Sequence, residues 1–421
     1  MRTLTREIDL SPKKILSSKI RRRAFLGKSA AVGLGALAAP AVFSSANRVL
    51  GANDKFVMGL VGAGGRGRNV MKKHIAFGVE FPMVCEVFEP RMQLGLQDAS
   101  PGAKPYGDYR QVLDSKDIHA VLIASPEHQH APMLKAAVAA GKDAYCEKPM
   151  SHSIEEGLEM VQAVRQTDRI VQVGMQRRSD PIVAQAKELL KECGNIYLVK
   201  AYWNWQVARP LNNTPLEGKL DWRSWLGSAK TLKFEPMRFR SWRVFWDYSG
   251  GHCADQGTHL MDVVQWFMNS GAPRSASCHG SVYGMTGSET PDVFSATYEY
   301  DNFMATWTLD YATAMDNGWN IKFLGDQATL WMDNQGARLY QTNIRGGFNR
   351  TEKAALVKDI PGNLTDRPHI ENFIDCCRTR KEPNAPVEVG HVAVCAPHLA
   401  NLAFHHKTQA RLNKEATRVY L

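Results

Sequence analysis

Short apolar runs alternate with helix-like stretches between about residues 55 and 192 of the chain. Each run is almost continuously apolar, as in strands of a parallel sheet that are buried on both faces. The runs are 56–61, 82–86, 120–124, 144–146 and 171–173. Strands that alternate with helices in this way predict a doubly wound α/β domain.

The pattern of apolar positions changes after residue 196. Residues 281–283, 294–300 and 303–309 alternate polar with apolar side chains, and Asp301 and Asn302 form a turn. This alternation predicts an antiparallel sheet with one covered face. Two further helices are expected at 370–378 and 391–406.

These patterns predict two domains, which suits a chain of 421 residues that is 44% apolar. We expect an N-terminal Rossmann domain, a doubly wound parallel sheet, over residues 54–180. We expect a C-terminal α+β domain with a large, open, mostly antiparallel sheet over 181–421, which binds substrate and forms oligomers. No apolar run reaches the roughly 20 residues that a spanning helix needs.

The net charge of +10 lies mainly in the first 28 residues, which carry nine basic and two acidic side chains. The rest of the chain carries only about a third of that excess, so a nucleic-acid partner is not expected. Arg21, Arg22 and Arg23 precede an uncharged, Ala/Gly-rich segment, with small residues at 39–41 and 44–46. Residues 1–46 therefore resemble a twin-arginine export signal, and an ordinary secretion signal or a disordered basic arm stays open.

This export signal predicts a periplasmic protein that interacts with the twin-arginine export machinery. Eight cysteines in an exported chain would normally suggest disulfide bonds. The sequence has no C-x-x-C pattern, and Cys85 and Cys146 lie in apolar runs. We therefore expect buried free thiols, with a single disulfide bridge left open.

A glycine-rich turn follows the first apolar run and precedes a predicted helix. It contains Gly62, Gly64 and Gly67 in a G-x-G-x-x-G pattern, with Gly65 and Arg66 inside it. The first glycine allows the tight turn, the second lets a pyrophosphate approach the backbone, and the third lets helix and strand pack closely. The pattern predicts a dinucleotide site in which the helix N-terminus faces the phosphates.

Glu86 ends the second run, where a carboxylate can hold the adenosine ribose hydroxyls. The same carboxylate would repel a 2′-phosphate, so the predicted cofactor is NAD. Arg66, Arg68 and Arg91 lie near it in the sequence, and they keep NADP possible.

Polar residues follow the next two runs, at the edge of the sheet where ligands bind in open α/β folds. Ser125 and His128 follow one run, and we expect them to meet the cofactor, although a histidine here is also typical of a helix start. Glu147 and Lys148 follow the next run, and Glu147 is included among the predicted cofactor-binding residues. Lys148 can donate to a substrate oxygen and to the cofactor ribose.

A predicted helix after Gly250 and Gly251 places Asp255 and His259 one turn apart on one face. A carboxylate beside an imidazole can orient it and tune its pKa, and such an imidazole can take a hydroxyl proton. Two alternatives stay open: a purely structural pair, and a metal site that also uses His252. No metal is predicted.

Six of the ten tryptophans lie within residues 203–246. Flat indole rings beside polar side chains suit the faces of a sugar. The same rings could equally pack an irregular connection, and the sequence does not separate these two interpretations.

Taken together, these motifs resemble the Gfo/Idh/MocA oxidoreductase family over residues 54–408. The matching stretches are 62–67, 124–128, 140–142, 146–149, 173–178, 255–259 and 372–375. The resemblance implies a Rossmann domain and an open-faced α/β domain, with substrate bound between them, and homodimers or homotetramers. It gives Lys148, Asp255 and His259 the roles of the family's catalytic residues, while Glu86 stands where most members carry Asp.

The expected function is hydride transfer between a sugar or polyol hydroxyl and a tightly bound nicotinamide cofactor, because free NAD is not expected outside the cytoplasm. One alternative is an NAD-dependent, redox-neutral glycoside hydrolase or lyase. Such an enzyme oxidises the sugar transiently, eliminates the aglycone and then returns the hydride. A second alternative is a non-catalytic protein that binds nucleotide or sugar. The fold alone does not separate these functions.

Overall fold

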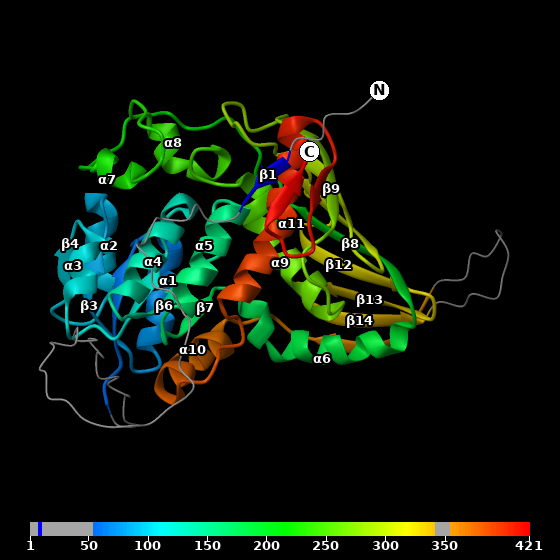
Figure 1. Cartoon of the computed structure of the whole chain (residues 1–421), viewed down its shortest axis with the longest axis horizontal. Coiled ribbons are helices and arrows are strands. Elements are labelled where there is room, and N and C mark those ends of the chain that lie inside the picture. The colour runs from blue at the N-terminus through cyan, green and yellow to red at the C-terminus, as the bar shows by residue number, and fades with distance from the viewer. Residues whose placement is uncertain (1–6, 11–53, 342–353) are drawn as a thin grey trace, which may run out of the picture.

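The computed structural model describes residues 7–10, 54–341 and 354–421. Two sheets, each with its own helices, make up these residues, and long helices lie between them (Figure 1). The shorter 3-10 helices are η1 (Glu127–Gln129), η2 (Gln176–Ser179), η3 (Leu190–Cys193) and η4 (Trp242–Val244).

The N-terminal sheet has six parallel strands in the order β4-β3-β2-β5-β6-β7. The strands are β2 (Val57–Val61), β3 (Glu80–Cys85), β4 (Lys104–Tyr106), β5 (Ala120–Ile123), β6 (Asp143–Cys146) and β7 (Val171–Val173). The helices are α1 (Gly65–Ile75), α2 (Glu89–Asp98), α3 (Tyr109–Asp114), α4 (His130–Ala139) and α5 (Ile154–Arg165). This confirms the predicted Rossmann sheet. The sequence pattern misses only the edge strand β4, because it is short and mostly exposed.

The second sheet has eleven strands in the order β1-β17-β16-β9-β10-β11-β8-β12-β13-β14-β15. These are β1 (Glu7–Asp9), β8 (Ile196–Asn204), β9 (Ser275–Ser281), β10 (Val293–Glu299), β11 (Met304–Asp310), β12 (Gly318–Gly325), β13 (Ala328–Asp333), β14 (Gly336–Gln341), β15 (Ala355–Pro361), β16 (Ala410–Leu412) and β17 (Arg418–Tyr420). All neighbouring pairs are antiparallel except β8 with β11, which confirms the predicted mostly antiparallel sheet.

One predicted strand, residues 281–283, is wrong. Strand β9 ends at Ser281, and the Asp292 carboxylate then accepts hydrogen bonds from the N–H groups of Tyr283, Gly284 and Met285. These three bonds fix a turn in place of a strand. The strands predicted at 294–300 and 303–309 correspond to β10 and β11.

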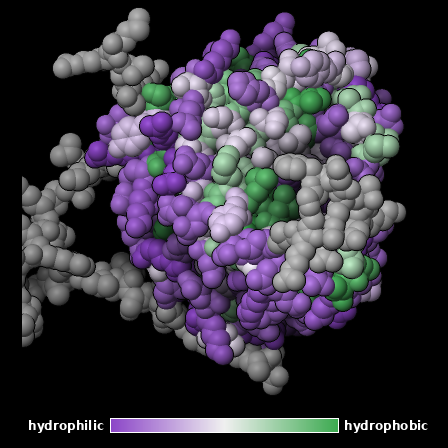
Figure 2. Space-filling model, turned by 90° about the vertical axis from the view of Figure 1, so that its right-hand side faces the viewer, coloured by the Kyte–Doolittle hydropathy of each residue, from purple (hydrophilic) through white to green (hydrophobic). Residues whose placement is uncertain are grey.

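Helices cover one face of the large sheet and leave the other face open (Figure 1). The helices that follow β7 in the sequence are α6 (Pro181–Leu189), α7 (Trp222–Leu226), α8 (Pro236–Arg240), α9 (Gly251–Phe267), α10 (Arg367–Thr379) and α11 (Val387–His406), of which α6, α9 and α11 contact the large sheet. Figure 2 shows the side of the molecule that carries the large sheet, which is mostly hydrophilic with hydrophobic patches. Tyr197 of β8 and Met304 of β11 are exposed apolar residues on neighbouring strands.

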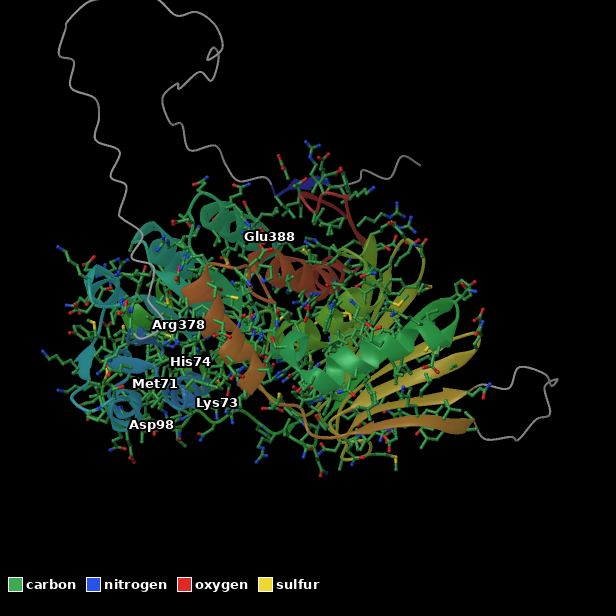
Figure 3. The ribbon with its side chains drawn as sticks, turned by 90° about the horizontal axis from the view of Figure 1, so that it is seen from below. Met71, Lys73, His74, Asp98, Arg378 and Glu388 are labelled. Atoms are coloured by element: carbon green, nitrogen blue, oxygen red, sulfur yellow. The ribbon has the colours of Figure 1, made fainter. Side chains whose placement is uncertain are left out.

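Helix α10 returns to the Rossmann sheet although it follows the large sheet in sequence (Figures 1 and 3). Ile370 and Phe373 share a buried cluster with Phe56, and Lys73 of α1 forms an ion pair with Asp366 just before α10. The predicted domain boundary at residue 180 therefore stays a prediction. Residues after this boundary, in α10, share a core with residues before it.

The predicted export signal falls largely outside the described residues, because its arginines, apolar segment and cleavage positions lie within 11–53. Residues 7–10 are described. Strand β1 pairs antiparallel with β17, and Arg418 forms an ion pair with Glu7. Leu10 is buried in the core of the large-sheet half. Residues 7–10, which lie within the predicted signal, are thus part of the large sheet and its core.

All eight cysteines lie in the described residues, and each is a buried free thiol. Burial raises the pKa of Cys146 above its ordinary value, so this thiol stays protonated. Among the described residues, no helix combines the length and the apolar character needed to cross a membrane.

Candidate functional site

The glycine-rich loop joins β2 to α1 at the carboxyl end of the Rossmann sheet. Gly62 has a φ of +94°, which favours glycine, and its N–H donates to the Cys85 carbonyl. A Cβ on Gly67 would lie 2.1 Å from the Gly62 carbonyl oxygen. Gly64 and Gly65 have open space where a Cβ would be. The loop therefore leaves room for phosphates at the N-terminus of α1.

We expect Gly67→Ala to lower the melting temperature of the protein without added nucleotide, because the new methyl group would collide with the loop backbone. The destabilisation should be about 1–3 kcal/mol, as for other overpacked sites. Gly65→Ala is the matched control, since its methyl group would meet no atom within 4 Å. Calorimetry of both variants would contradict this account if the two melted at the same temperature.

The Glu86 carboxylate holds the backbone around the loop. It accepts hydrogen bonds from the N–H groups of Ala63 at 2.9 Å, Val87 at 2.8 Å and Phe88 at 3.1 Å. It also lines a pocket together with Gly62 and Gly64. An acid that is fixed in this way is placed to accept ribose hydroxyls, which fits the predicted adenosine contact.

The predicted cofactor-binding residues divide into two groups. Gly62, Gly64, Gly65, Arg66, Glu86 and Ser125 line one pocket. The buried Ser125 Oγ has no hydrogen-bond partner among the described residues, so it is available to a ligand. The other four predicted residues do not line this pocket: Gly67, His128, Glu147 and Lys148. His128 Nε2 instead lies 3.1 Å from the Trp225 carbonyl, between the rings of Trp225 and Tyr248.

Two arginines near the loop are paired with carboxylates. Arg66 donates to Glu147 at 2.8 Å and to Asp366 at 3.2 Å, and Arg68 donates to Asp98 at 2.9 Å. These pairings use charges that could otherwise attract a 2′-phosphate. The third arginine, Arg91, lines the pocket beside Glu86, and its guanidinium lies 4.6 Å from the centre of the Phe239 ring. Glu86 in the same pocket fits NAD.

Lys148 and Asp255 meet although they are 107 positions apart in the sequence. Lys148 Nζ donates to Asp255 Oδ1 at 2.7 Å and to the Asp255 carbonyl at 2.8 Å. Arg243 Nε lies 3.4 Å from the other carboxylate oxygen. Burial alone would raise the pKa of Asp255, but the charges of Lys148 and Arg243 outweigh it and hold that pKa below its usual range.

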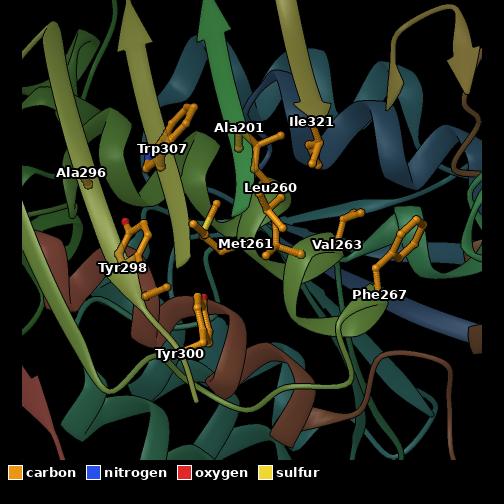
Figure 4. Packing of buried hydrophobic residues seen from close by; sticks show 14 of the residues in the cluster. Ala201, Leu260, Met261, Val263, Phe267, Ala296, Tyr298, Tyr300, Trp307 and Ile321 are labelled. Carbon is orange, nitrogen blue, oxygen red and sulfur yellow. The ribbon is translucent and has the colours of Figure 1, made fainter. Parts of the chain in front are cut away.

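Helix α9 carries Asp255 and His259, and its burial fixes their position. Leu260, Met261 and Val263 pack against side chains of the large sheet such as Trp307 (Figure 4). Gly257 makes the close approach possible, because a Cβ there would lie 2.7 Å from the Trp307 indole nitrogen. The helix is therefore held firmly between the two sheets.

His259 lies one turn after Asp255 on α9, as predicted, and is 9% exposed. Burial, with the positive charges of Lys148, Arg177 and Arg66, lowers the pKa of His259 well below its ordinary value. The imidazole is therefore neutral at pH 7 and able to accept a proton. Within the described ranges no hydrogen bond joins it to Asp255, whose carboxylate is engaged by Lys148.

Glu127 is a buried residue at this site to which the sequence analysis gave no role. Its carboxyl group accepts from Ser249 Oγ at 2.8 Å and from the Gly250 N–H at 2.9 Å. It thereby ties the Rossmann domain to the start of α9. Burial and the nearby Asp255 charge raise the pKa of Glu127 to about 8. Its position in the 124–128 stretch was the only sequence signal.

Arg177 is a second such residue. It is 7% exposed, its guanidinium lies 3.9 Å from the centre of the Trp319 ring, and Nη1 has no partner among the described residues. Trp319 pairs across the sheet with Trp203, whose buried Nε1 also lacks a partner there. Burial lowers the pKa of Arg177 to about 9. Unpartnered buried donors of this kind are available to a polar ligand.

The tryptophan-rich segment separates into two parts. Trp203 and Trp205 belong to the sheet side, where their rings meet edge to face at 5.1 Å. Trp222 and Trp225 stack at 4.7 Å within an aromatic cluster that reaches the Rossmann domain. Trp222 and Trp225 therefore pack an irregular connection, and the sugar-face interpretation stays a prediction. Over the described ranges, His252, Asp255 and His259 do not form a group that could hold a metal.

Two family models match the chain. The model described as "Oxidoreductase family, NAD-binding Rossmann fold" matches residues 56–175, and the "GFO/IDH/MocA C-terminal domain" matches residues 183–331. Together they cover more than half of the chain. The chain therefore carries an NAD-binding Rossmann domain, and NAD is its cofactor.

Curated relatives match only part of their own length. Inositol 2-dehydrogenase of Salmonella paratyphi B is 31% identical over 135 residues, or 31% of this chain and 40% of that protein. Levoglucosan dehydrogenase of Pseudarthrobacter phenanthrenivorans is 29% identical over 224 residues, half of each protein. The chain thus spans about half or less of the length of these relatives.

Solved structures share the fold over most of the chain. Levoglucosan dehydrogenase in complex with NADH and levoglucosan superimposes with a TM-score of 0.67, at 17% identity, over 85% of this chain and 99% of that one. The WlbA dehydrogenase of Bordetella pertussis, in complex with NADH and UDP-GlcNAcA, gives 0.65 at 19% identity, over 85% and 99%. The motifs, the two sheets and the two family matches agree, and the chain belongs to the Gfo/Idh/MocA family of NAD(P)-dependent oxidoreductases.

Proposed function

We propose that this protein transfers hydride between a sugar or polyol hydroxyl and a tightly held NAD. The observation that carries the proposal is the contact between Lys148, just after β6, and Asp255 of α9, one turn before the neutral His259. Bound NAD supplies the hydride acceptor at its nicotinamide ring. The side chains of this protein supply the proton transfer and the charge.

Lys148 is proposed to stabilise the negative charge that develops on the reacting oxygen. Its ammonium group is mostly buried, and Asp255 fixes it from one side with two hydrogen bonds. The three donors of an ammonium group leave one for a substrate oxygen. A fixed charge in a buried site stabilises such an oxygen better than water does.

His259 is proposed to accept the hydroxyl proton. A base must be unprotonated to act, and the lowered pKa of His259 keeps its imidazole neutral at neutral pH. The positive charges of Lys148 and Arg177 around it also disfavour the imidazolium that forms. The proton is therefore expected to leave His259 readily in the following step.

A sugar or polyol fits the chemistry of the buried residues Arg177, Trp203 and Trp319, and the charge of Arg177 reaches His259 and lowers its pKa. Trp203 and Trp319 offer indole rings, and Arg177 Nη1 and Trp203 Nε1 are unpartnered donors among the described residues. Ring faces with a few polar donors are typical of carbohydrate sites.

The test is a mass measurement followed by an assay. Denaturing the purified protein should release NAD, and incubation with a panel of deuterated sugars should transfer deuterium to the bound cofactor. Failure of every sugar and polyol to transfer deuterium to protein that holds NAD would contradict the proposal. If the protein cleaved a nitrophenyl glycoside and no NADH accumulated, the result would contradict net oxidoreduction and support the redox-neutral hydrolase or lyase reaction.

We further propose that the protein is exported by the twin-arginine route and forms homodimers or homotetramers. The paired arginines at 21–23 support export, and the open face of the large sheet supports assembly. Substituting Arg22 and Arg23 with lysine should leave the protein in the cytoplasm. Sedimentation of the purified protein should give the mass of two or four chains.

A further inference from the structure

We propose that residues 219–248, the cover segment, close the cleft over the adenosine end of the bound dinucleotide and retain it through many turnovers. The inference rests on the proposed function in one respect, that NAD is the resident cofactor. It assigns to this tryptophan-rich segment a task that neither the family models nor the relatives give it.

The cover segment is bonded to both sides of the nucleotide cleft. On the β3 side, the Glu89 N–H donates to the Lys219 carbonyl and the Asp221 N–H donates to the Val87 carbonyl, both at 2.9 Å. On the β5 side, Gln129 Nε2 donates to the Trp225 carbonyl at 2.9 Å. Strands β3 and β5 flank β2, which leads into the glycine-rich loop. The single turn of α7 therefore crosses above that loop.

The side chains of the cover segment face the nucleotide pocket. Ser224, Trp225, Trp242 and Arg243 line the pocket that Gly64, Glu86 and Ser125 also line. Two indoles and a guanidinium suit an aromatic base and a phosphate, through stacking and charge. The buried, unpartnered Ser125 Oγ is an independent sign of a ligand in the same pocket.

Packing holds the cover segment in this position. Trp225, Phe239 and Tyr248 are buried in one aromatic cluster with Phe88 of the Rossmann domain. The guanidinium of Arg91 lies 4.6 Å from the centre of the Phe239 ring. Opening the cleft would expose these rings and break the hydrogen bonds on both sides. Release of the nucleotide is therefore expected to be slow.

Arg243 joins the cover segment to the catalytic helix. Its guanidinium lies over the Trp242 ring at 4.3 Å, and its Nε lies 3.4 Å from Asp255 Oδ2. The segment that covers the adenosine end thus also contacts the carboxylate that holds Lys148. Retention of the nucleotide and alignment of the reacting groups depend on the same closed arrangement.

The experiment measures nucleotide exchange in the full chain. Protein loaded with radiolabelled NAD is mixed with excess unlabelled NAD, without any sugar, and the label that stays bound is followed on desalting columns. The wild-type protein should keep most of its label for hours. Loss of the label within the first minute would overturn the proposal, and this measurement needs no variant.

Variants then assign the retention to the cover segment. In Gly227→Val, the new side chain would displace Gln129 and break its hydrogen bond to the Trp225 carbonyl, because a Cβ at Gly227 lies 2.2 Å from Gln129 Nε2. This variant and Trp225→Ala should exchange label at least ten-fold faster. Arg240→Ala is the matched control, since it breaks bonds only to Thr214 and Pro215 on the same side of the cleft.

Three outcomes decide this inference, and the last two separate it from the proposed function. Circular dichroism first establishes that Gly227→Val is folded. If this variant then exchanges label no faster than the wild type, the cover assignment is overturned. Slow exchange in a protein that oxidises no sugar would support the cover segment and contradict the proposed reaction. Fast exchange in a protein that oxidises sugars would overturn the cover segment alone.

Discussion

Lys148→Ala is expected to lower kcat/KM by about two to four orders of magnitude, as for other groups that stabilise developing charge. The variant removes the ammonium group that Asp255 holds at 2.7 Å. Labelled NAD should still bind, because Lys148 is not among the residues that line the nucleotide pocket with Gly64 and Glu86. The measurement is steady-state kinetics on an active sugar, with retained label as the second readout.

Two further variants sharpen this experiment. Lys148→Arg keeps a positive charge beside Asp255 but replaces the compact ammonium with a planar fork, so most of the activity should still be lost. Lys135→Ala is the control, since Lys135 pairs with Glu159 on the Rossmann helices. If Lys148→Ala and the control had the same kcat/KM, Lys148 would have no part in the reaction.

Acid is expected to destabilise the protein steeply between pH 6.5 and pH 4. Burial lowers the pKa to about 4 for six histidines in the folded state. They are His74, His128, His252, His369, His391 and His398. Below pH 6.5 the unfolded chain therefore binds more protons than the folded chain, and the free energy of unfolding falls as the pH falls.

Each such histidine lowers the free energy of unfolding by on the order of 2 kcal/mol at pH 5 relative to pH 7.5. Because folded proteins have only about 5–15 kcal/mol of stability, several of these losses together are large. Calorimetry at pH 7.5, 6.5, 5.5 and 5.0 should show a falling melting temperature. A melting temperature that stayed constant over this range would contradict the buried neutral state of these side chains.

His74→Phe is a matched variant for this pH effect. The His74 ring meets Phe81, Tyr145 and Phe373 edge to face, and its Nε2 has no partner among the described residues. A phenyl ring keeps these ring contacts and cannot bind a proton, although it loses the 2.9 Å contact between His74 Nδ1 and the Val70 carbonyl. The variant should therefore show a smaller loss of stability on acidification than the wild type.

The sequence predicted the fold well because the fold depends on local patterns. Apolar runs such as 120–124 became buried strands, and the glycine-rich loop formed between a strand and a helix. Strand β4 was missed because its few exposed residues have no apolar pattern. Residues 281–283 were misassigned because the Asp292 carboxylate accepts hydrogen bonds from the N–H groups of Tyr283 and the two residues after it, which turns the chain there.

The site was predicted in part, for a related reason. Lys148 follows the end of β6, and Asp255 and His259 lie in the first half and at the middle of α9, within motifs that the sequence reveals. The contact between Lys148 and Asp255 depends on how the two domains pack, and no local pattern encodes that packing. The tryptophans of 203–246 stayed ambiguous because stacking on a sugar and packing in a core need the same side chains.

Strand β1 has a consequence for any processing of the N-terminal segment. While residues 7–10 remain covalently joined to the body, the tether keeps them at a high effective concentration beside β17. A cut between Leu10 and Asp54 would make the same contact bimolecular. Burial of Leu10 contributes about 1.5–3 kcal/mol, far less than the roughly 8 kcal/mol of micromolar binding. The released peptide would dissociate, and β17 would become a free edge.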